Sequence, residues 1–405
     1  MKFGKIGTIG KVFLVCAIAL SVATLFTACS STLTVGFLFV ATNLQTPGQI
    51  QVYEVNSQAG SLRTIPTSPF PSGGRNPVSE ATSNDFKNLY VANEDDNNVV
   101  QFGIGTDGKL YPQATVNTPG SFPMAIAVNS GDTFLYGVDI LQPIAGCSLS
   151  NACPGDVFIC PMAPDGALGT PVNGTNRCPQ YYPLQLTASD TKTILTPTAL
   201  NVLANGQYLY VTAYNAALTP KVGYLFVFAT NADGTLTAVP AGSGGQIPLT
   251  LGVQPVAMAS DSGSAYLYVV DKLQNSLATY AIQSGGIPTW QSAASTGSQP
   301  SGLTLSGTNL LYVSNSLDST VTGYNISSGN LTNFGTYATS TNPIAIAGDP
   351  RELGFVYTVN FLGNSLSGYQ INPATGALIN TKNSPYQSTP QPTAIAGIPH
   401  NGNTH

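Results

Sequence analysis

Leu311-Tyr-Val-Ser-Asn315, followed by the turn Gly329-Asn330-Leu331, is one of seven copies of the same short unit along the chain. The strand-like Leu-Tyr-Val, or a variant of it, begins at Leu38, Leu89, Leu135, Leu209, Leu267, Leu311 and Val356. A Gly-x-Leu or Gly-x-Ile turn follows each copy, at Gly60, Gly108, Gly166, Gly234, Gly285, Gly329 and Gly376. Seven copies of one unit predict seven structural repeats.

Each repeat contains four pieces of strand length. The first opens with a proline, which suits the first position of a strand, where no ladder donor is needed: Pro77, Pro123, Pro197, Pro255, Pro300, Pro343 and Pro392. The second is the Leu-Tyr-Val strand, which usually ends at Asn or Asp. The third ends on an aromatic residue that we expect in the core: Tyr53, Phe102, Phe158, Phe228, Tyr280, Tyr324 and Tyr369. Gly-x-Leu then turns into the fourth.

Four antiparallel strands repeated radially predict an all-β fold, a seven-bladed β-propeller of four-stranded blades. The chain starts in the second strand of blade 1 and ends with a spare first strand, Pro392-Thr-Ala-Ile-Ala396. We expect that strand to complete blade 1 as its innermost member, because ring closure leaves no open edge. The predicted segments are 1–28 (signal), 29–36 (tether), 37–397 (propeller) and 398–405 (tail).

The N-terminus predicts export. Lys2, Lys5 and Lys11 precede an apolar run over 12–26, which is too short to span a membrane. Thr27-Ala28-Cys29 resembles the lipobox of bacterial lipoproteins, which implies cleavage before Cys29 and its lipidation. A plain signal peptide is the alternative, because Phe26 departs from the usual Leu. Ser30 after the cysteine implies the outer membrane of the cell envelope, facing the periplasm or the surface.

The composition excludes one class of partner. Charged residues make up 8% of the chain, and 13 Lys and Arg against 18 Asp and Glu give a net charge of -5. Nucleic-acid binding depends on clustered Lys and Arg, and the chain has no basic cluster. We expect a monomer without a cofactor, which contacts the membrane only through its lipid anchor. Its partner would be an envelope protein, a peptide or a glycan.

Four cysteines remain after the signal and Cys29 are set aside, and all lie in one repeat: Cys147, Cys153, Cys160 and Cys178. An even, local set in an exported protein predicts disulfides, with three possible connectivities. Zinc is the alternative, but the spacings lack the close Cys-x2-Cys pairs of structural zinc sites. We therefore expect no metal site.

Blades 3 and 4 carry enlarged connections. The excess falls between the second and third strands and before the next innermost strand, so we expect both kinds of insertion on one face. Long loops on a rigid scaffold often bind ligands. The candidate binding residues are Asp139, Tyr181, Tyr182, Tyr214 and Lys221. Neutral insertions tied down by disulfides are the alternative.

The units, such as Leu89-Tyr-Val-Ala-Asn93 with Asp107-Gly-Lys-Leu110, resemble the seven-bladed lactonase family, which includes 6-phosphogluconolactonases. The resemblance covers residues 37–397 and implies lactone hydrolysis by His, Arg and Glu around the mouth of the central channel. This chain offers few such residues. Its histidines are His400 and His405, and its arginines are Arg63, Arg75, Arg177 and Arg351.

Three carboxylates are candidate catalytic residues: Glu80, Glu94 and Asp271. Glu80 replaces an apolar residue of the other innermost strands, and buried carboxylates often mark functional sites. Pairing with Arg75, or exposure of an irregular strand, is the alternative. Glu94 opens the run 94–98, whose oxygens suit Ca²⁺, but the run lacks the spacing of an EF-hand loop, and a solvated turn is the favoured interpretation. Asp271 ends a second strand, where a side-chain turn is the structural explanation.

Lactone opening needs a general base and stabilisation of the developing oxyanion, which this chain is poorly equipped to supply. The sequence therefore predicts a lipid-anchored propeller that acts as a non-catalytic binding or scaffold module through the blade 3 and 4 loops. Hydrolysis of an extracytoplasmic lactone is the alternative.

Overall fold

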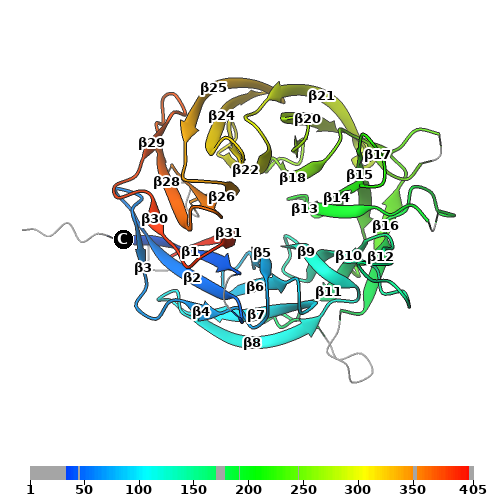
Figure 1. The fold of residues 1–405 in the computed structure, drawn as a ribbon, viewed down its shortest axis with the longest axis horizontal. Helices are drawn as coiled ribbons and strands as arrows, with labels where there is room; N and C mark the ends of the chain where they lie inside the picture. Colours follow the sequence, from blue (N-terminus) through cyan, green and yellow to red (C-terminus); the bar gives the residue numbers. More distant parts are fainter. Residues whose placement is uncertain are drawn as a thin grey trace, which may run out of the picture. The chain divides into compact units, whose positions relative to one another are not determined.

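The computed structural model describes residues 33–43, 46–169, 178–190, 192–244, 246–349 and 354–400. These residues form seven antiparallel sheets arranged as a ring of blades (Figure 1). The predicted all-β, seven-bladed propeller is confirmed. The ring runs from Thr34 to Pro399, slightly beyond the predicted 37–397 at both ends. The signal, the tether and residues 401–405 lie outside the described residues.

Blades 1 to 3 contain the following strands. Blade 1 has β31 (Pro392–Pro399), β1 (Thr34–Thr42), β2 (Gln49–Asn56), β3 (Leu62–Thr64) and β4 (Phe70–Pro71). Blade 2 has β5 (Pro77–Thr82), β6 (Asn88–Asn93), β7 (Asn98–Ile104) and β8 (Leu110–Asn117). Blade 3 has β9 (Ser121–Val128), β10 (Phe134–Leu141), β11 (Asp156–Pro161) and β12 (Gln180–Pro183).

Blades 4 to 7 repeat the pattern. Blade 4 has β13 (Thr196–Val202), β14 (Tyr208–Asn215), β15 (Val222–Thr230), β16 (Leu236–Val239) and β17 (Leu249–Thr250). Blade 5 has β18 (Pro255–Ser260), β19 (Tyr266–Asp271), β20 (Ser276–Ile282), the 3₁₀ turn η1 (Ser284–Gly286) and β21 (Pro288–Ser295). Blade 6 has β22 (Pro300–Ser306), β23 (Leu310–Asn315), β24 (Thr320–Ser327) and β25 (Asn330–Ala338). Blade 7 has β26 (Pro343–Gly348), β27 (Phe355–Asn360), β28 (Ser365–Ile371), β29 (Leu378–Asn380) and β30 (Tyr386–Gln387).

The ring closes as predicted. β31 pairs with β1, with Ala394 opposite Ala41 and Pro399 opposite Gly36. Each innermost strand packs against the innermost strands of both neighbouring blades, and β31 lies between β26 and β5. The ring is therefore closed, and the first and last strands of the propeller belong to one sheet. Each innermost strand is hydrogen-bonded on one side only, to the second strand of its own blade.

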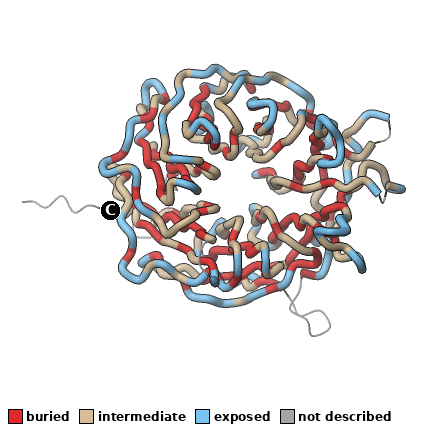
Figure 2. The backbone as a smooth tube through the Cα atoms, viewed as in Figure 1, coloured by how far each residue is buried: buried red, intermediate tan, exposed pale blue. Residues whose placement is uncertain are grey.

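The core lies between the blades, where Figure 2 shows most of the buried backbone in the middle of the sheets, outside the innermost strands. All seven aromatic residues that end the third strands are buried, as predicted. The Gly-x-Leu turns complete this core, because the tyrosine of one second strand donates to the glycine carbonyl in the next blade's turn. Tyr312 Oη donates to Gly376 O at 2.7 Å, and Tyr357 Oη donates to Gly60 O at 2.8 Å. The two repeated motifs are thus the two halves of one joint between blades.

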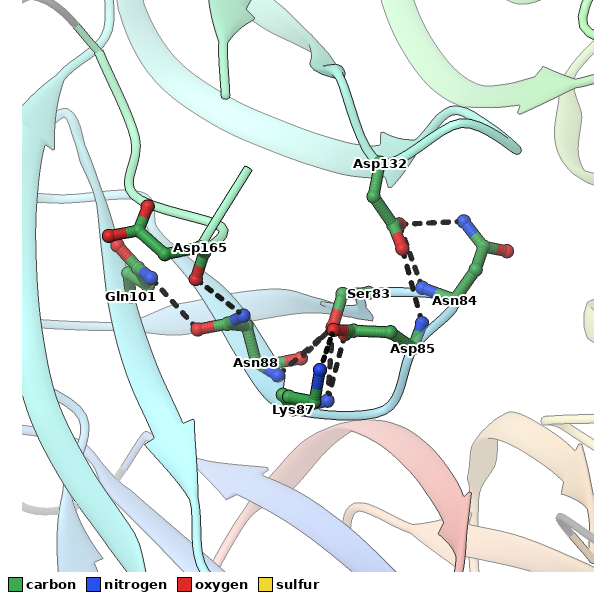
Figure 3. A network of polar contacts seen from close by, with 8 residues as sticks. All are labelled: Ser83, Asn84, Asp85, Lys87, Asn88, Gln101, Asp132 and Asp165. Carbon is green, nitrogen blue, oxygen red and sulfur yellow. Dashed lines mark hydrogen bonds and ion pairs between the residues drawn. The ribbon is translucent and has the colours of Figure 1, made fainter. Parts of the chain in front are cut away.

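The strand connections define two faces. The turns between second and third strands, and the segments leading to the next innermost strand, emerge on what we call the upper face. The opposite turns form the lower face. A network of polar contacts ties blades 2 and 3 together there (Figure 3): Asp132 Oδ1 accepts the Asn84 backbone N–H at 2.8 Å, and Asn88 Nδ2 donates to Asp165 O at 3.2 Å. Charged residues of this network are therefore engaged in structure. Among the described residues, no helix has the length and apolar character needed to cross a membrane.

Candidate functional site on the upper face

The residue directly before each innermost proline lies on the upper face, next to the propeller axis. We call these residues the inner ring. Five of the seven carry a carboxamide side chain: Asn76, Gln254, Gln299, Asn342 and Gln391. All five are half-buried, and the ring is completed by Phe122 and Thr196. Amide groups both donate and accept hydrogen bonds, so this ring carries both functions at one place. Part of this capacity is used within the protein, because the Asn76 side chain donates to Glu94 and accepts from Asn43. Asn342 Nδ2 also donates to Ser316 O at 3.3 Å.

Much of the inner ring is held in a left-handed backbone conformation. The φ angles are 53° at Asn76, 51° at Gln299, 60° at Asn342 and 54° at Gln391. Phe122, at φ 63°, shares this conformation. Such conformations cost free energy in residues other than glycine and persist where the surroundings hold them. The surroundings here are the neighbouring turns.

A four-residue turn of the upper face binds two members of the inner ring at once. In blade 6, the N–H of Ser316 donates to Gln299 O at 2.9 Å, within the same blade. The fourth residue, Ser319, accepts the N–H of Asn342 from blade 7 at 3.3 Å. Blades 5 and 7 repeat the second contact, since Gln299 N donates to Asn275 Oδ1 and Gln391 N to Asn364 Oδ1. The ring positions are therefore fixed before any ligand arrives.

Glu94 lies at the inner ring, as the first residue of the blade 2 turn. Its carboxylate accepts Asn76 Nδ2 at 2.6 Å, and its backbone N–H donates to Asn76 O at 2.9 Å. Partial burial raises the pKa of Glu94, and the neighbouring Asp95 adds to that rise, while the Asn76 bond opposes it. Of the three predicted catalytic carboxylates, Glu94 alone is both at the ring and partly accessible.

Glu80 is half-buried as a residue, but its two carboxylate oxygens are buried between blades 1 and 2. Its two carboxylate oxygens make no hydrogen bond of normal geometry, although the backbone amides of Ala41 and Ala396 lie close by. Desolvation raises its pKa well above the usual range, and these amides oppose the shift. The predicted pairing with Arg75 is wrong, because Arg75 Nε donates to Asp96 Oδ1 at 2.7 Å. A buried acid without a partner is held most cheaply in its neutral form.

Asp271 is occupied by the backbone. Its Oδ2 accepts the N–H groups of Val253 and Gln254 at 2.6 and 2.9 Å. Its Oδ1 accepts those of Leu273 and Gln274 at 3.0 and 2.8 Å. Both carboxylate oxygens are thus taken up by backbone donors, and Asp271 stabilises the turn that follows β19.

Asp139 belongs to a buried acid pair. It faces Asp156 across β10 and β11, and both side chains are fully buried. Asp139 Oδ2 accepts Gly120 N at 2.8 Å, whereas both oxygens of Asp156 lack a hydrogen-bond partner. Desolvation, and then the charge of Asp139, raise the pKa of Asp156 well above its usual range. This burial prevents Asp139 from contacting a ligand in the described conformation, so its predicted binding role is not supported.

The other predicted binding residues divide between two places. Lys221 lies over the ring of Tyr214, 4.7 Å from its centroid, and its Nζ is 3.5 Å from Gln254 Oε1 in the inner ring. Tyr181 and Tyr182 instead lie on β12, the outermost strand of blade 3. Tyr182 Oη accepts Leu236 N at 3.1 Å, which makes it a contact to blade 4. Tyr214 and Lys221 are thus near the ring, and the other two tyrosines are not.

The disulfides are confirmed, with the connectivity Cys147–Cys153 and Cys160–Cys178. The first closes the long β10–β11 loop of the upper face. The second is buried in the core, where Cys178 N also donates to Asn117 O of blade 2 at 3.1 Å. Cys178 therefore lies in the core, next to the outermost strand of blade 2. Disulfides indicate an oxidising, extracytoplasmic compartment.

The spacing predicted that all insertions lie on one face, and the structure differs in part. The β10–β11 loop does lie on the upper face. In blade 4, however, β16 and β17 both pair with β15, so the insertion between them interrupts the outer strand. It projects from the edge of the ring. The sequence spacing could not distinguish a longer loop from a divided strand, because both delay the next proline by the same amount.

Sequence reasoning missed the inner ring itself and Arg75. The guanidinium of Arg75 donates to Asp96 and to Asp95 O, beside Glu94 and Asn76. These contacts engage much of the run 94–98 within the protein, and Asn98 Oδ1 accepts Asn93 Nδ2. In the described part of the chain, no three His, Cys, Asp or Glu side chains gather in a way that could hold a metal ion. The ring signal was available, as an Asn or Gln directly before five of the seven prolines.

A cavity of about 390 Å³ opens on the lower face between blades 4, 5 and 6. Its lining includes Asn201, Ser260, Asp261 and Thr308. Asp261, the single ionisable side chain of this lining, accepts the N–H groups of Ala265 and Tyr266 at 2.8 and 2.6 Å. The cavity has the size of a small-ligand site, but the one ionisable side chain of its lining is already bonded to the backbone. The upper face combines a carboxylate, cations and amides, so we take it as the candidate site.

The fold defines a seven-bladed β-propeller with its polar ring on the upper face. A profile of the family described as "Lactonase, 7-bladed beta-propeller" matches residues 34–139, 226–348 and 262–396. The chain belongs to this family. The unmatched residues between 139 and 226 run from the end of β10 in blade 3 to β15 in blade 4, and they include the β10–β11 loop and the buried disulfide. None of the curated proteins matches the chain.

Solved structures share the fold. A candidate 6-phosphogluconolactonase from Bacteroides fragilis is 18% identical, with a TM-score of 0.72 over 91% of this chain and 99% of that one. A periplasmic gluconolactonase from Pseudomonas aeruginosa is 18% identical, with a TM-score of 0.72 over 90% and 99%. A protein from Lactobacillus plantarum is 17% identical, with a TM-score of 0.71 over 90% and 100%. At these identities the likeness establishes the fold alone.

Proposed function

We propose that this chain is an exported propeller that binds a neutral, hydroxyl-rich ligand, such as a glycan or a sugar lactone, at the inner ring. The single observation that carries this proposal is the ring of five carboxamides, fixed in place by the upper-face turns. Hydroxyl groups donate and accept at once, and amides match them without a net charge. Preorganised polar groups also lower the entropy cost of binding.

The surroundings of the ring support binding of a ligand without net charge. Glu94 lies on blade 2, whereas Lys221 and Lys272 lie near Gln254, beside blades 4 and 5. A strongly charged ligand would meet one favourable and one unfavourable group. Because surface charges are screened within about 10 Å at ordinary salt, neither sign dominates the ring.

The cellular place follows from the N-terminus and the disulfides. We propose a lipid anchor at Cys29 in the outer membrane, with the propeller facing the periplasm or the surface. The polypeptide enters the propeller at the lower face, where β1 begins. A cysteine-free N-terminus in the mature protein, found by mass spectrometry, would contradict lipidation.

Calorimetric titration tests the proposal on the soluble form that begins at Ser30. We expect binding of at least one neutral sugar or lactone from a panel, and loss of at least tenfold in affinity in Gln254→Ala and Gln299→Ala. Gln283→Ala is the matched control, because Gln283 lies on the lower face and contacts Thr289. Equal losses in the control, or full affinity in the ring variants, would refute the assignment.

Lactone hydrolysis is the second candidate, favoured by the position of Glu94. With its raised pKa, Glu94 is suited to accept a proton from water that attacks a lactone carbonyl at the ring. The acyl–oxygen bond then breaks, and the departing alkoxide takes a proton to give the hydroxy acid. Amide N–H groups of the inner ring would stabilise the oxyanion.

A pH-stat assay across a lactone panel tests this second candidate. Activity should rise with pH through the elevated pKa of Glu94 and fall at least a hundredfold in Glu94→Gln. Glu54→Gln is the control, since Glu54 pairs with Arg63 on blade 1 at 2.7 Å. A flat trace would leave binding as the function, and turnover that survives Glu94→Gln would exclude Glu94 as the base.

A further inference from the structure

Three leucines stand exposed at equivalent positions of three consecutive blades. Leu273, Leu317 and Leu362 are each the second residue of a four-residue turn on the upper face, and they are 49%, 65% and 62% exposed. Turn tips usually carry polar residues or glycine. Single exposed leucines are common on proteins, but the same exposed leucine at one repeat position in three adjacent blades is a pattern. We call these residues the leucine tips.

Each leucine tip is next in sequence to the residue that binds the inner ring. Leu317 follows Ser316, whose N–H donates to Gln299 O at 2.9 Å. The same bond joins Lys272 to Gln254 and Phe361 to Asn342, both at 2.9 Å. Blades 5, 6 and 7 therefore each present a carboxamide at the ring and a leucine one turn position further along. The result is a polar ring beside an arc of aliphatic side chains.

The arc continues on the loops of blades 4 and 3. Leu218 in the β14–β15 loop is 43% exposed, and Ile144 and Leu149 in the β10–β11 loop are 50% and 69% exposed. On blade 2 the corresponding turn position holds the exposed Asp95. Aliphatic side chains thus follow the upper face over blades 3 to 7 and stop at the acidic turn of blade 2.

From this arrangement we infer that the ligand is an amphiphile, with a neutral hydroxyl-rich or lactone head group at the inner ring and an aliphatic chain across the leucine tips. This inference rests on the proposed function of the ring. A wholly apolar partner, such as a bilayer interior, would bury the carboxamides, Glu94 and Lys272 without partners, which is costly. A simple sugar would leave the tips exposed. A ligand with both characters satisfies both surfaces.

Chain length provides the test. The probes are methyl, hexyl and octyl β-glucosides and δ-lactones with matching alkyl substituents, all kept below their critical micelle concentrations. Full burial of a methylene contributes about fourfold in affinity, so we expect about twofold or more per added carbon on this open surface. Titration calorimetry with the soluble form beginning at Ser30 measures the slope.

The double variant Leu317→Ser with Leu362→Ser should reduce the slope to nearly none while methyl-probe affinity stays unchanged. Ile379→Ser is the matched control, because Ile379 is 59% exposed on β29, at the outer edge of blade 7. This control should keep the full slope.

The outcomes separate the two proposals. Binding that does not depend on chain length would overturn the amphiphile inference and leave the proposed function standing. Absence of binding by every probe would count against both. A slope retained in the double variant would place the alkyl chain elsewhere. Concentration-dependent self-association that the double variant abolishes would assign the tips to a second copy of the chain, and would also overturn the inference.

Discussion

Single carboxylates behave differently in this propeller because their surroundings differ. Asp271 is saturated by four backbone donors, Glu94 shares one amide at the inner ring, and Glu80 is buried without normal hydrogen bonds. The same functional group therefore serves as a structural anchor, a candidate ligand contact and a neutral core residue. Burial and hydrogen bonding decide which, and burial is the main cause of the raised pKa of both Glu80 and Glu94.

Glu80 gives a prediction about stability and pH. A carboxyl whose pKa is raised by folding binds its proton more tightly when folded, so its contribution weakens as pH rises from about 4 towards the raised value. Glu80→Gln has no such titration. We expect its melting temperature to approach that of the wild type at pH 4 and to exceed it increasingly up to pH 8. Differential scanning calorimetry across this range measures the difference, and a constant difference would show that Glu80 does not titrate in the folded protein.

At the scale of elements, the Gly-x-Leu turns form the repeated contacts between neighbouring blades. In six of the seven Gly-x-Leu turns, the glycine has a positive φ and also lies against a side chain of the preceding blade. In blade 5, a positive φ without a close contact and a positive φ with one occur in adjacent glycines. Gly285 has φ 81° with no other atom near its missing Cβ, whereas Gly286 has φ 76° and packs on the ring of Tyr208.

This pair predicts unequal costs for the same substitution. Gly285→Ala should lower the free energy of unfolding by about 1 kcal/mol, the cost of the left-handed backbone. Gly286→Ala adds a clash with Tyr208 and should cost about 3 kcal/mol. Urea unfolding at equilibrium measures both. Equal costs would mean that the joint between blades 4 and 5 yields without strain.

The two disulfides should also differ. Cys160–Cys178 is buried and spans 18 residues between parts of the core, so replacing both cysteines by alanine should cost about 3 kcal/mol. Cys147–Cys153 spans 6 residues in a surface loop, and its loss should cost about 2 kcal/mol. The same unfolding measurement compares them, and the reverse order would contradict the placement of Cys178 in the core.

At the scale of the whole molecule, repetition made the fold predictable. Seven similar units fix the blade number, and the spare final strand fixes the closure, because each depends on pattern and not on any single contact. The site was harder to predict. Asp139 and Asp156 are 17 positions apart in sequence order but face each other across two strands, and the divided outer strand of blade 4 has the same spacing as a loop. The inner ring is also a repeated feature of the sequence. Its backbone conformation, however, depends on hydrogen bonds to the upper-face turns, which the sequence pattern does not reveal.

The proposed ligand site is therefore the upper face as a whole. It combines a ring of carboxamides with an arc of leucines, on the side opposite the entry of the chain. This arrangement uses the propeller as a rigid frame, since each turn joins two neighbouring blades. Fold alone does not determine activity, so the claim depends on the ring and its ligand.

A crystal structure of the soluble form with its tightest ligand from the panels tests this claim most directly. We predict ligand density at the inner ring, with hydroxyl or lactone oxygens about 2.7–3.2 Å from the carboxamides of Gln254, Gln299 or Asn342. Density in the lower-face cavity beside Asn201 and Ser260, with the inner ring empty, would contradict the account.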